Sequence, residues 1–214
     1  MDKRTFIRNW ISRKSNFPTD GLVMYAPLDR YSLTARTGQE FYNPPPEEAY
    51  TKHNGVPCCR VLGKSSTNVD FIYGDEFTLS TWSCANQIVT AVFGYFLGQS
   101  SCFYVSSQST GVTSKAVYFL NVNGNVLYSK LSPDGAWHHF LVTYKSGLAK
   151  LHIDGIFIGE VKGTVKVSSH TCVVVPIVSD SVDTGNFVAG ARAYSRELSS
   201  DEIRSLASEF RTVS

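Results

Sequence analysis

The sequence predicts an all-β protein, an antiparallel two-sheet β-sandwich with a short helix near each end of the chain. Of its 214 residues, 13% are aromatic and 18% are charged, and many Tyr, Phe, Val and Thr with few charges favour strands over helices. Three tight-turn dipeptides separate strand-like segments between residues 116 and 162, where five such segments follow one another. Such a meander is antiparallel, because parallel strands need long crossovers. The length suits one large sandwich domain.

The first 18 residues are expected to form an arm, and residues 19–214 to form the sandwich. Residues 1–14 carry five Lys or Arg and one Asp. Four apolar side chains recur there at helical spacing, namely Phe6, Ile7, Trp10 and Ile11, which predicts an amphipathic helix that ends before Pro18. Two roles stay open: docking on the sandwich, or attachment to a partner, a homo-oligomer or a larger particle. The shortness of the helix disfavours a membrane-surface role.

The first strand is expected at residues 21–28 (GLVMYAPL). A long polar stretch follows over residues 29–60, with three consecutive prolines at 44–46. Connections of that length are commonly functional, so this stretch is the first place to look for a binding site.

Strand patterns then recur at short intervals. Residues 77–83 (FTLSTWS) alternate, and either face suits the core, although Trp82 favours its own face. Residues 88–97 and 101–107 predict two more strands, with Gly94 as a bend or bulge.

The central hairpins give the clearest pattern. Asn123-Gly124 is a strong hairpin turn, because both central residues must take positive φ. Ser146-Gly147 and Asp154-Gly155 mark two further turns. The strands that these turns join are expected at residues 116–122, 125–130, 137–145, 148–154 and 156–162.

The chain is expected to close with strands at residues 171–178 and 186–194, followed by a helix that begins at Ser199. Ser199 and Glu202 have the spacing of a capping box. Apolar side chains at i, i+3, i+4 and i+7 predict one buried helix face, made of Ile203, Leu206, Ala207 and Phe210.

Cysteine number and spacing argue against a disulfide framework. There are five, Cys58, Cys59, Cys84, Cys102 and Cys172, an odd count with irregular spacing. We expect free thiols of a reducing compartment, with one bridge such as Cys84 to Cys102 left open. No Cys/His cluster has the spacing of a zinc site.

Targeting and charge patterns are weak. The basic N-terminus lacks the apolar core of a signal peptide, and the longest apolar run, at residues 173–178, is too short to span a bilayer. The net charge of +2 gives no indication of nucleic-acid binding. The sequence therefore predicts a soluble protein that is not membrane-embedded; its location stays unknown, with a virion among the alternatives.

Two late segments resemble the laminin G-like domains of the concanavalin A-like lectin and glucanase kind. In residues 136–160, Trp-His-His opens a strand and the return strand ends in Asp-Gly, as in the signature hairpin of that family. Residues 191–203 (ARAYSRELSSDEI) are similar to its closing strand and short C-terminal helix. Residues 77–83 and 21–29 resemble an early core strand and the opening strand. The resemblance implies a jelly-roll sandwich over about residues 20–210.

The resemblance also implies structural roles for its signature residues. Trp82 and Trp137 are expected in the sandwich core. Arg192, Tyr194 and Leu198 are expected to hold the last strand and helix on the sheet.

The chain departs from the family just before the closing Arg-x-Tyr. Many relatives carry acidic residues there, whereas residues 188–191 are Val-Ala-Gly-Ala. Calcium needs several oxygen ligands. Asp180 and Asp183 lie nearby and keep calcium open, but the sequence supports neither a metal site nor another cofactor.

The sequence predicts no catalytic residues. Retaining glycosidases hold two carboxylates about 5–5.5 Å apart, which on a strand requires alternate acidic residues. The acids here are neighbours, such as Asp75-Glu76, whose side chains would point apart on a strand. His138 and His139 must likewise lie on opposite faces of one strand. Nucleophile-elbow, P-loop and dinucleotide motifs are absent from the sequence.

What remains is a non-catalytic binding module that recognises carbohydrate at a cell surface or within a phage-like particle. Candidate ligand contacts are aromatic, amide, His and Asp side chains of the expected loops: Tyr42, Tyr50, His53, Asn54, Asp180 and Asn186. One alternative is a structural protein that uses the sandwich as a scaffold in a larger particle and binds a protein surface. A second alternative is a divergent glycoside hydrolase.

Overall fold

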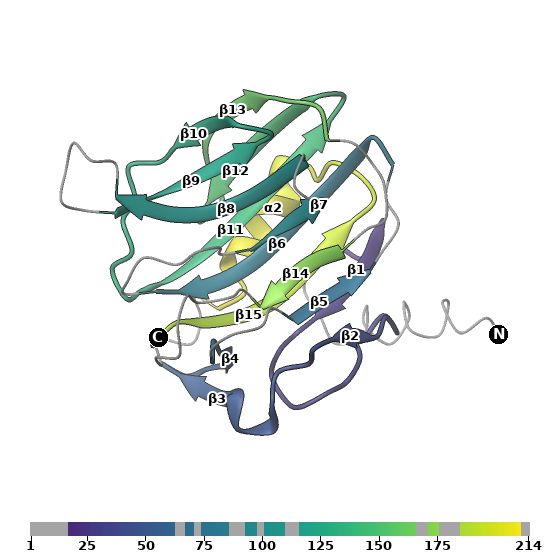
Figure 1. Ribbon diagram of the computed structural model, residues 1–214, viewed down its shortest axis with the longest axis vertical. Helices are drawn as coiled ribbons and strands as arrows, with labels where there is room; N and C mark the ends of the chain where they lie inside the picture. Colours follow the sequence, from purple (N-terminus) through teal and green to yellow (C-terminus); the bar gives the residue numbers. More distant parts are fainter. Residues whose placement is uncertain are drawn as a thin grey trace.

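Two antiparallel sheets stacked face to face form the body of the protein (Figure 1). The structure is a computed structural model, and it describes residues 17–62, 67–70, 74–85, 93–97, 101–109, 116–165, 171–175 and 185–210. The predicted all-β jelly-roll sandwich is confirmed. The arm expected at residues 1–18 lies outside the described residues, apart from Phe17 and Pro18.

The larger sheet has eight strands. Its order is β13 (Ile156–Lys162), β12 (Leu148–Ile153), β11 (Trp137–Lys145), β6 (Glu76–Cys84), β15 (Phe187–Tyr194), β4 (Val56–Arg60) and β3 (Tyr50–His53), and β1 (Leu22–Ala26) also pairs with β15. The smaller sheet has seven strands. Its order is β10 (Asn125–Tyr128), β9 (Ala116–Val122), β8 (Ser101–Ser109), β7 (Phe93–Leu97), β14 (Thr171–Val175), β5 (Thr67–Asp70) and β2 (Phe41–Tyr42).

In the described part of the chain, four two-residue turns with positive φ at both positions each join the two strands of a hairpin. The three predicted turns adopt this geometry, and Asn123-Gly124, for example, has φ of 50° and 88°. The fourth, Asn54-Gly55 with φ of 50° and 79°, joins β3 to β4. The stretch 29–60 was expected to be a long loop, and the structure corrects this expectation: it holds β2, the 3-10 helix η1 (Glu47–Ala49), β3 and β4.

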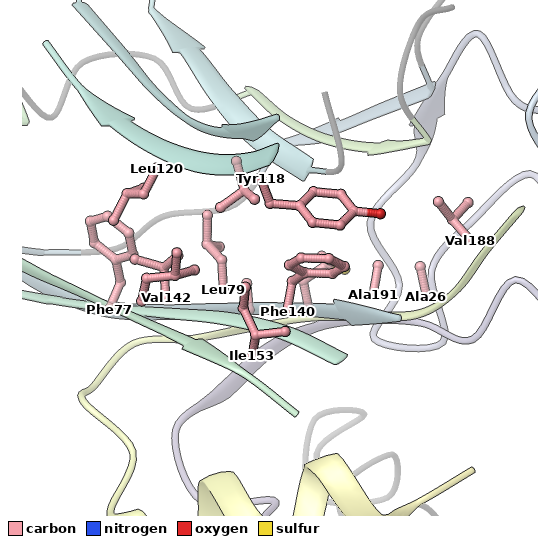
Figure 2. Packing of buried hydrophobic residues seen from close by; sticks show 14 of the residues in the cluster. Ala26, Phe77, Leu79, Tyr118, Leu120, Phe140, Val142, Ile153, Val188 and Ala191 are labelled. Carbon is pink, nitrogen blue, oxygen red and sulfur yellow. The ribbon is translucent and has the colours of Figure 1, made fainter. Parts of the chain in front are cut away.

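The sandwich core fills the space between the sheets (Figure 2). Phe77 and Leu79 of β6 face Tyr118 and Leu120 of β9 across this layer. Their alternation along each strand places every second side chain in the core, because successive residues point to opposite faces.

The two signature tryptophans lie outside this layer. Trp82 is only 1% exposed, but it alternates with Leu79 and Thr81 and therefore packs on the outer face of the larger sheet, against Val56, Cys58 and Ala189. Trp137 is partly buried in the same outer cluster. The expected burial of Trp82 is correct, but the expected layer is wrong: a second, smaller apolar cluster covers the outside of the sheet.

Helix α2 (Ser200–Ser208) covers the outer face of the larger sheet. The predicted capping box is present: the Ser199 side chain accepts from the Glu202 backbone, and the Glu202 carboxylate accepts from the Ser199 N–H at 2.9 Å. Ile203 and Leu206 pack on Leu141 of β11. Among the described residues, no helix is long and apolar enough to cross a membrane.

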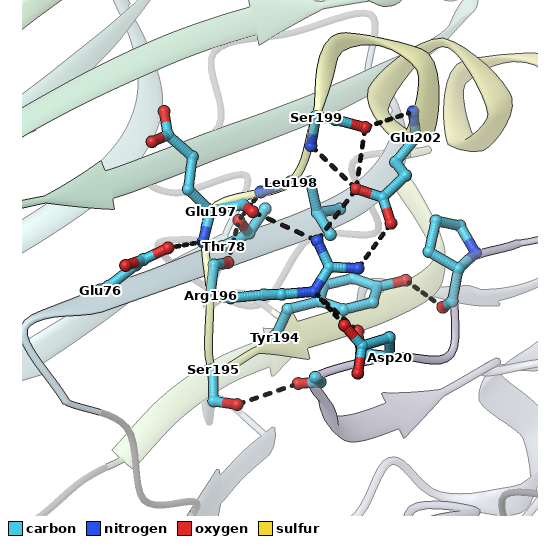
Figure 3. A network of polar contacts seen from close by, with 12 residues as sticks. Asp20, Glu76, Thr78, Tyr194, Ser195, Arg196, Glu197, Leu198, Ser199 and Glu202 are labelled. Carbon is cyan, nitrogen blue, oxygen red and sulfur yellow. Dashed lines mark hydrogen bonds and ion pairs between the residues drawn. The ribbon is translucent and has the colours of Figure 1, made fainter.

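A polar network around Arg196 connects α2 to β15 and to the segment that precedes β1 (Figure 3). Its guanidinium donates to both Glu202 carboxylate oxygens and forms an ion pair with Asp20 at 3.0 Å. The hydrogen bond from Arg196 lowers the pKa of Glu202 to about 2. The Tyr194 hydroxyl donates to the Pro18 carbonyl at 3.2 Å. Tyr194 thus helps to hold the ends of the domain together.

Candidate functional site

The connection between β1 and β2 lies in the lower part of Figure 1. Together with Tyr50 of β3, it lines a pocket. Its volume is about 430 Å³. The connection leaves β1 in the larger sheet and enters β2 in the smaller one, so the pocket lies at the edge where the two sheets meet. Its wall residues include Asp29, Arg30, Ser32, Arg36, Phe41 and Tyr50.

Backbone hydrogen bonds hold the pocket wall in place. Within the connection, the Phe41 N–H donates to the Leu33 carbonyl at 2.9 Å, and the Ala35 N–H donates to the Gln39 carbonyl at 2.8 Å. The Arg36 N–H donates to the Tyr25 carbonyl at 2.8 Å, which ties the connection to β1. A wall fastened in this way is preformed, as in most small-molecule sites.

One wall residue has an unusual backbone. Leu28 has a φ of 59°, a left-handed conformation that costs a bulky residue about 1–3 kcal/mol. Its side chain is buried in the core, and this burial holds the residue in place. Such outliers cluster at functional sites.

The pocket contains two buried polar atoms that make no hydrogen bond with any described residue, Asp29 Oδ1 and the Tyr50 hydroxyl. The other Asp29 oxygen, Oδ2, accepts from Arg36 Nη2 at 2.6 Å. The Ser32 backbone approaches the Tyr50 hydroxyl without reaching normal hydrogen-bond geometry. Burial raises the pKa of Tyr50, so its hydroxyl stays protonated and can donate. Because unpaired buried polar atoms are rare and costly, the pair marks a place where a polar ligand fits.

An exposed aromatic side chain packs against the pocket residue Tyr50. Tyr31 is 46% exposed, and its ring meets that of Tyr50 edge to face with centroids 6.0 Å apart. Leu33, in the same connection, is also exposed. The site therefore combines apolar surface with a few polar atoms, a mixture typical of ligand pockets.

The residues predicted from the sequence divide between the pocket and other places. Tyr50 lines the pocket. Tyr42 is exposed on β2, next to the pocket residue Phe41, but adjacent strand residues point to opposite faces. His53 belongs to β3 and stacks on Phe187 with centroids 4.0 Å apart.

Of the remaining three predicted residues, two lie away from this site and the third is not described. Asn54 occupies the β3–β4 turn, where its positive φ gives it a structural role. Asn186 is 1% exposed and therefore buried rather than on a loop surface. Asp180 lies outside the described residues. Tyr42, Tyr50 and His53 were expected in a loop and instead lie on strands, whereas Asn54 lies in a turn and Asn186 lies just before β15, outside the strand.

Sequence reasoning missed Asp29, Arg36 and Tyr31. The sequence offered one signal for the ion pair: Asp29 and Arg36 carry opposite charges and stand seven residues apart in the polar stretch after the first strand. Their ion pair depends on the connection folding back on β1, which no local pattern encodes.

Two further polar clusters resemble catalytic arrangements but lack access or a cavity. Ser80 Oγ lies 2.8 Å from His139 Nε2, the spacing of a nucleophile and its base. Both side chains are buried, and the Trp82 ring lies 5.1 Å from that of His139. This pair is buried beside Trp82, and no substrate can reach it as folded.

The other cluster is a histidine held between two carboxylates. His138 Nδ1 is 2.7 Å from Asp154 Oδ2, and its Nε2 is 3.1 Å from Asp134 Oδ1. Burial lowers the pKa of His138, but the hydrogen bond and charge of Asp154, together with Asp134, outweigh burial and raise it. The cluster ties two turns to β11. His138 and His139 lie on opposite faces, as predicted.

Metal ligands and reactive thiols are not evident in the part of the chain that the structure describes. There, no group of three or more His, Cys, Asp or Glu could hold a metal ion. Cys58, Cys59 and Cys84 are free and buried, so a bridge from Cys84 to Cys102 does not form. Burial raises the pKa of Cys59 to about 12, which leaves a weakly reactive thiol.

Solved structures share this architecture. Domain 4 of AbnA, a GH43 extracellular arabinanase from Geobacillus stearothermophilus solved in complex with arabinotriose, matches with a TM-score of 0.64 and 14% identity, over 87% of this chain and 98% of that one. Trypanosoma rangeli sialidase matches with a TM-score of 0.63 and 14% identity, over 92% of this chain and 34% of the sialidase. This chain thus spans about a third of the sialidase. At these identities the likeness shows the fold alone.

Sequence comparisons give the family. A search of curated proteins finds no match. The family model described as the concanavalin A-like lectin/glucanases superfamily matches residues 63–204, more than half of the chain. The match includes β6, the central hairpins, the closing strand and the start of α2. With this match and the two-sheet fold, the chain belongs to the concanavalin A-like lectin/glucanase superfamily.

Proposed function

We propose that this protein is a non-catalytic carbohydrate-binding module whose binding site is the pocket between the β1–β2 connection and β3. One observation carries the proposal: a preformed pocket in which Asp29 Oδ1 and the Tyr50 hydroxyl are buried without partners among the described residues. Sugar hydroxyls both donate and accept hydrogen bonds, so they can satisfy a carboxylate oxygen as well as a hydroxyl group. Tyr31, which is exposed and packs against Tyr50, is an aromatic side chain close enough to stack on the apolar side of a sugar that extends beyond the pocket.

The fold supports this class of ligand. Domain 4 of AbnA, with the same architecture, was solved in complex with arabinotriose. The family includes lectins and glucanases, so it is consistent with a sugar ligand and leaves catalysis to be judged from the site.

Binding without hydrolysis follows from the acids at the pocket. Asp29 is the one carboxylate among its wall residues, whereas glycosidases of the common type need a pair. Asp29 is also already paired with Arg36. A divergent hydrolase would need a second carboxylate that the described wall does not supply.

The test is isothermal titration calorimetry of the full chain against a panel of neutral and acidic oligosaccharides, with Tyr50→Phe as the pocket variant. Tyr50→Phe removes a hydroxyl without a protein partner among the described residues, so the thermal unfolding midpoint should hold while affinity falls about tenfold. Tyr128→Phe, on the distant strand β10, is the matched control and should bind like the wild type. Absence of binding across the panel, or equal affinity for both variants, contradicts the proposal. Release of shorter sugars from a bound oligosaccharide contradicts its non-catalytic part.

A further inference from the structure

Two hairpins of this protein have the same dipeptide at their turn. Asn54-Gly55 joins β3 to β4 near the bottom of Figure 1, and Asn123-Gly124 joins β9 to β10 near the top. Both hairpins pair four residues of one strand with four of the other. Both Asn residues have a φ of 50° and are exposed. The two sites are matched in sequence, backbone and solvent access, so a difference in their chemistry has to come from what holds each turn closed.

An Asn followed by Gly can lose its side-chain amide without an enzyme. The Gly backbone nitrogen attacks the Asn Cγ and forms a new C–N bond. The bond from Cγ to Nδ2 breaks, and ammonia leaves with the proton that the Gly nitrogen gives up. Water then opens the cyclic imide at either carbonyl and leaves aspartate or isoaspartate. Gly favours the attack because it has no Cβ to crowd its nitrogen.

The closed turn does not react. Both turns have the two positive φ values of a type I′ turn, in which the Gly nitrogen points away from the Asn side chain. The attack therefore requires the turn to open, and its rate follows the fraction of molecules in which the turn is open. Each hydrogen bond that holds the turn closed lowers this fraction by about two- to tenfold.

The turn at Asn123 is held by two such bonds. The Gly124 N–H donates to Asn121 Oδ1 at 3.0 Å, so the attacking nitrogen is itself engaged. Asn123 Nδ2 donates to the Thr164 carbonyl, in the segment that follows β13. The leaving group is thus engaged as well, and the turn is fastened to the other sheet.

The turn at Asn54 lacks both of these bonds. The residue three positions before Gly55 is Lys52, whose side chain has no acceptor. Among the described residues, the Asn54 amide contacts its own neighbour, with 3.4 Å between Nδ2 and His53 Nε2. Trp137 Nε1 donates to the His53 carbonyl at 3.1 Å, which anchors the end of β3 but neither turn residue. The turn can therefore open between strand ends that stay in place.

We propose that Asn54 is a site of spontaneous modification to aspartate and isoaspartate, and that Asn123 is protected by the fold. The two bonds at the Asn123 turn predict a rate that is roughly tenfold higher at Asn54. Isoaspartate adds a methylene group to the backbone of a turn whose length sets the register of β3 and β4. The modified turn follows directly on β3, the strand that carries the pocket residue Tyr50. The proposal uses no pocket residue and is independent of carbohydrate binding.

The experiment incubates the folded full chain at mildly alkaline pH and follows both sites by mass spectrometry of tryptic peptides. Trypsin releases residues 53–60 (HNGVPCCR), in which Asn54 is the one amide side chain, and residues 116–130 (AVYFLNVNGNVLYSK). Fragment ions separate Asn123 from the neighbouring Asn residues of the second peptide. Acidic forms should accumulate roughly tenfold faster at Asn54. In guanidinium chloride most of this difference should disappear, because no turn is then held closed.

Variants test the cause of the protection. Asn121→Ala frees the Gly124 N–H, so the rate at Asn123 should rise by about two- to tenfold while the rate at Asn54 stays unchanged. Asn54→Gln and Asn123→Gln form a matched pair for isoelectric focusing of the intact chain. The first should abolish the early acidic form, and the second should leave it in place. Thermal unfolding of each variant shows whether the fold is retained.

Four results would overturn the proposal. The first is an equal or higher rate at Asn123 in the folded chain. The second is a difference that persists undiminished in guanidinium chloride, since the sequence and not the fold would then cause it. The third is an unchanged rate at Asn123 in folded Asn121→Ala. The fourth is an absence of acidic forms at Asn54 in the folded chain over a time that converts both sites in guanidinium chloride.

Discussion

Replacing Glu209 by Gln removes the counter-charge of a fully buried arginine. The Arg192 side chain on β15 is 0% exposed, and its Nη2 donates to Glu209 Oε1 at 2.7 Å. Its guanidinium carbon lies 4.1 Å from the ring centroid of Phe17 and 4.7 Å from that of Tyr25. Arg192 therefore connects the residue after α2 to Phe17, which precedes β1, and to Tyr25 within β1. Loss of the carboxylate leaves the cation without a counter-charge in a low-dielectric site, although Arg192 Nη1 still donates to the Gly190 carbonyl at 3.0 Å.

The expected loss in free energy of unfolding depends on how deeply Arg192 and Glu209 are buried. Removing one partner of a buried pair costs about 3–5 kcal/mol. Glu209 is 24% exposed, and Gln keeps an amide oxygen that can accept from Arg192, so the loss in free energy of unfolding should be about 2–3 kcal/mol. For a chain of this size, that corresponds to a fall in Tm of roughly 4–12 °C.

Urea unfolding followed by tryptophan fluorescence measures the loss, because Trp82 lies 5.2 Å from the Phe210 ring beside the C-terminal helix. Asp201→Asn, which removes an exposed carboxylate from the same helix, is the control and should cost less than about 1 kcal/mol. A Glu209→Gln loss below about 0.5 kcal/mol, no larger than that of an exposed pair, would refute the idea that this ion pair holds the helix. Recovery of stability in Arg192→Met with Glu209→Gln would support it, since no buried charge remains.

Three further predictions concern pH, turns and core packing. Asp154 and Asp134 raise the pKa of His138 above its ordinary value, so its contribution to stability is complete below pH of about 6.5 and is lost as pH rises through the folded-state pKa. The difference in urea midpoint between wild type and His138→Gln should therefore shrink from pH 6 to pH 9, and a constant difference would contradict the ion pairs. Ser146 holds a φ of 48° in an exposed turn, so Ser146→Gly should raise the thermal midpoint by relieving roughly 1 kcal/mol of backbone strain; a lower midpoint would show that the turn is unstrained. Phe140→Ala removes a fully buried ring between the sheets and should cost about 3–5 kcal/mol in urea unfolding, whereas a loss under about 1 kcal/mol would mean that the layer repacks.

Much of the fold could be predicted because its signals are local. Two residues, Asn-Gly or Asp-Gly, are enough to favour a turn with positive φ. Four residues, Ser199 to Glu202, are enough to mark the start of the C-terminal helix by a capping box. Asn54-Gly55 carries the same hairpin signal, and it joins β3 to β4 inside the proline-containing stretch for which one long loop is predicted.

The face of β6 illustrates what local patterns leave undecided. Alternation specifies that Leu79 and Trp82 point in opposite directions, and both are buried. Which side chain enters the sandwich depends on the partner sheet and on what covers the outer face. Here, Phe210 after α2 and the β3–β4 hairpin cover the outside, so both faces of the strand are apolar.

The sequence by itself determined the antiparallel sandwich, its hairpins, the helix cap and the family, because periodicity and turn chemistry act over a few neighbouring residues. Tertiary structure decided the candidate site. Asp29 and Arg36 meet because the β1–β2 connection folds back on β1, and Tyr50 reaches them because the proline stretch returns the chain along the edge of the larger sheet as β3. Contacts between segments separated in sequence depend on how the backbone is closed into loops, and residue patterns within each segment do not specify that closure.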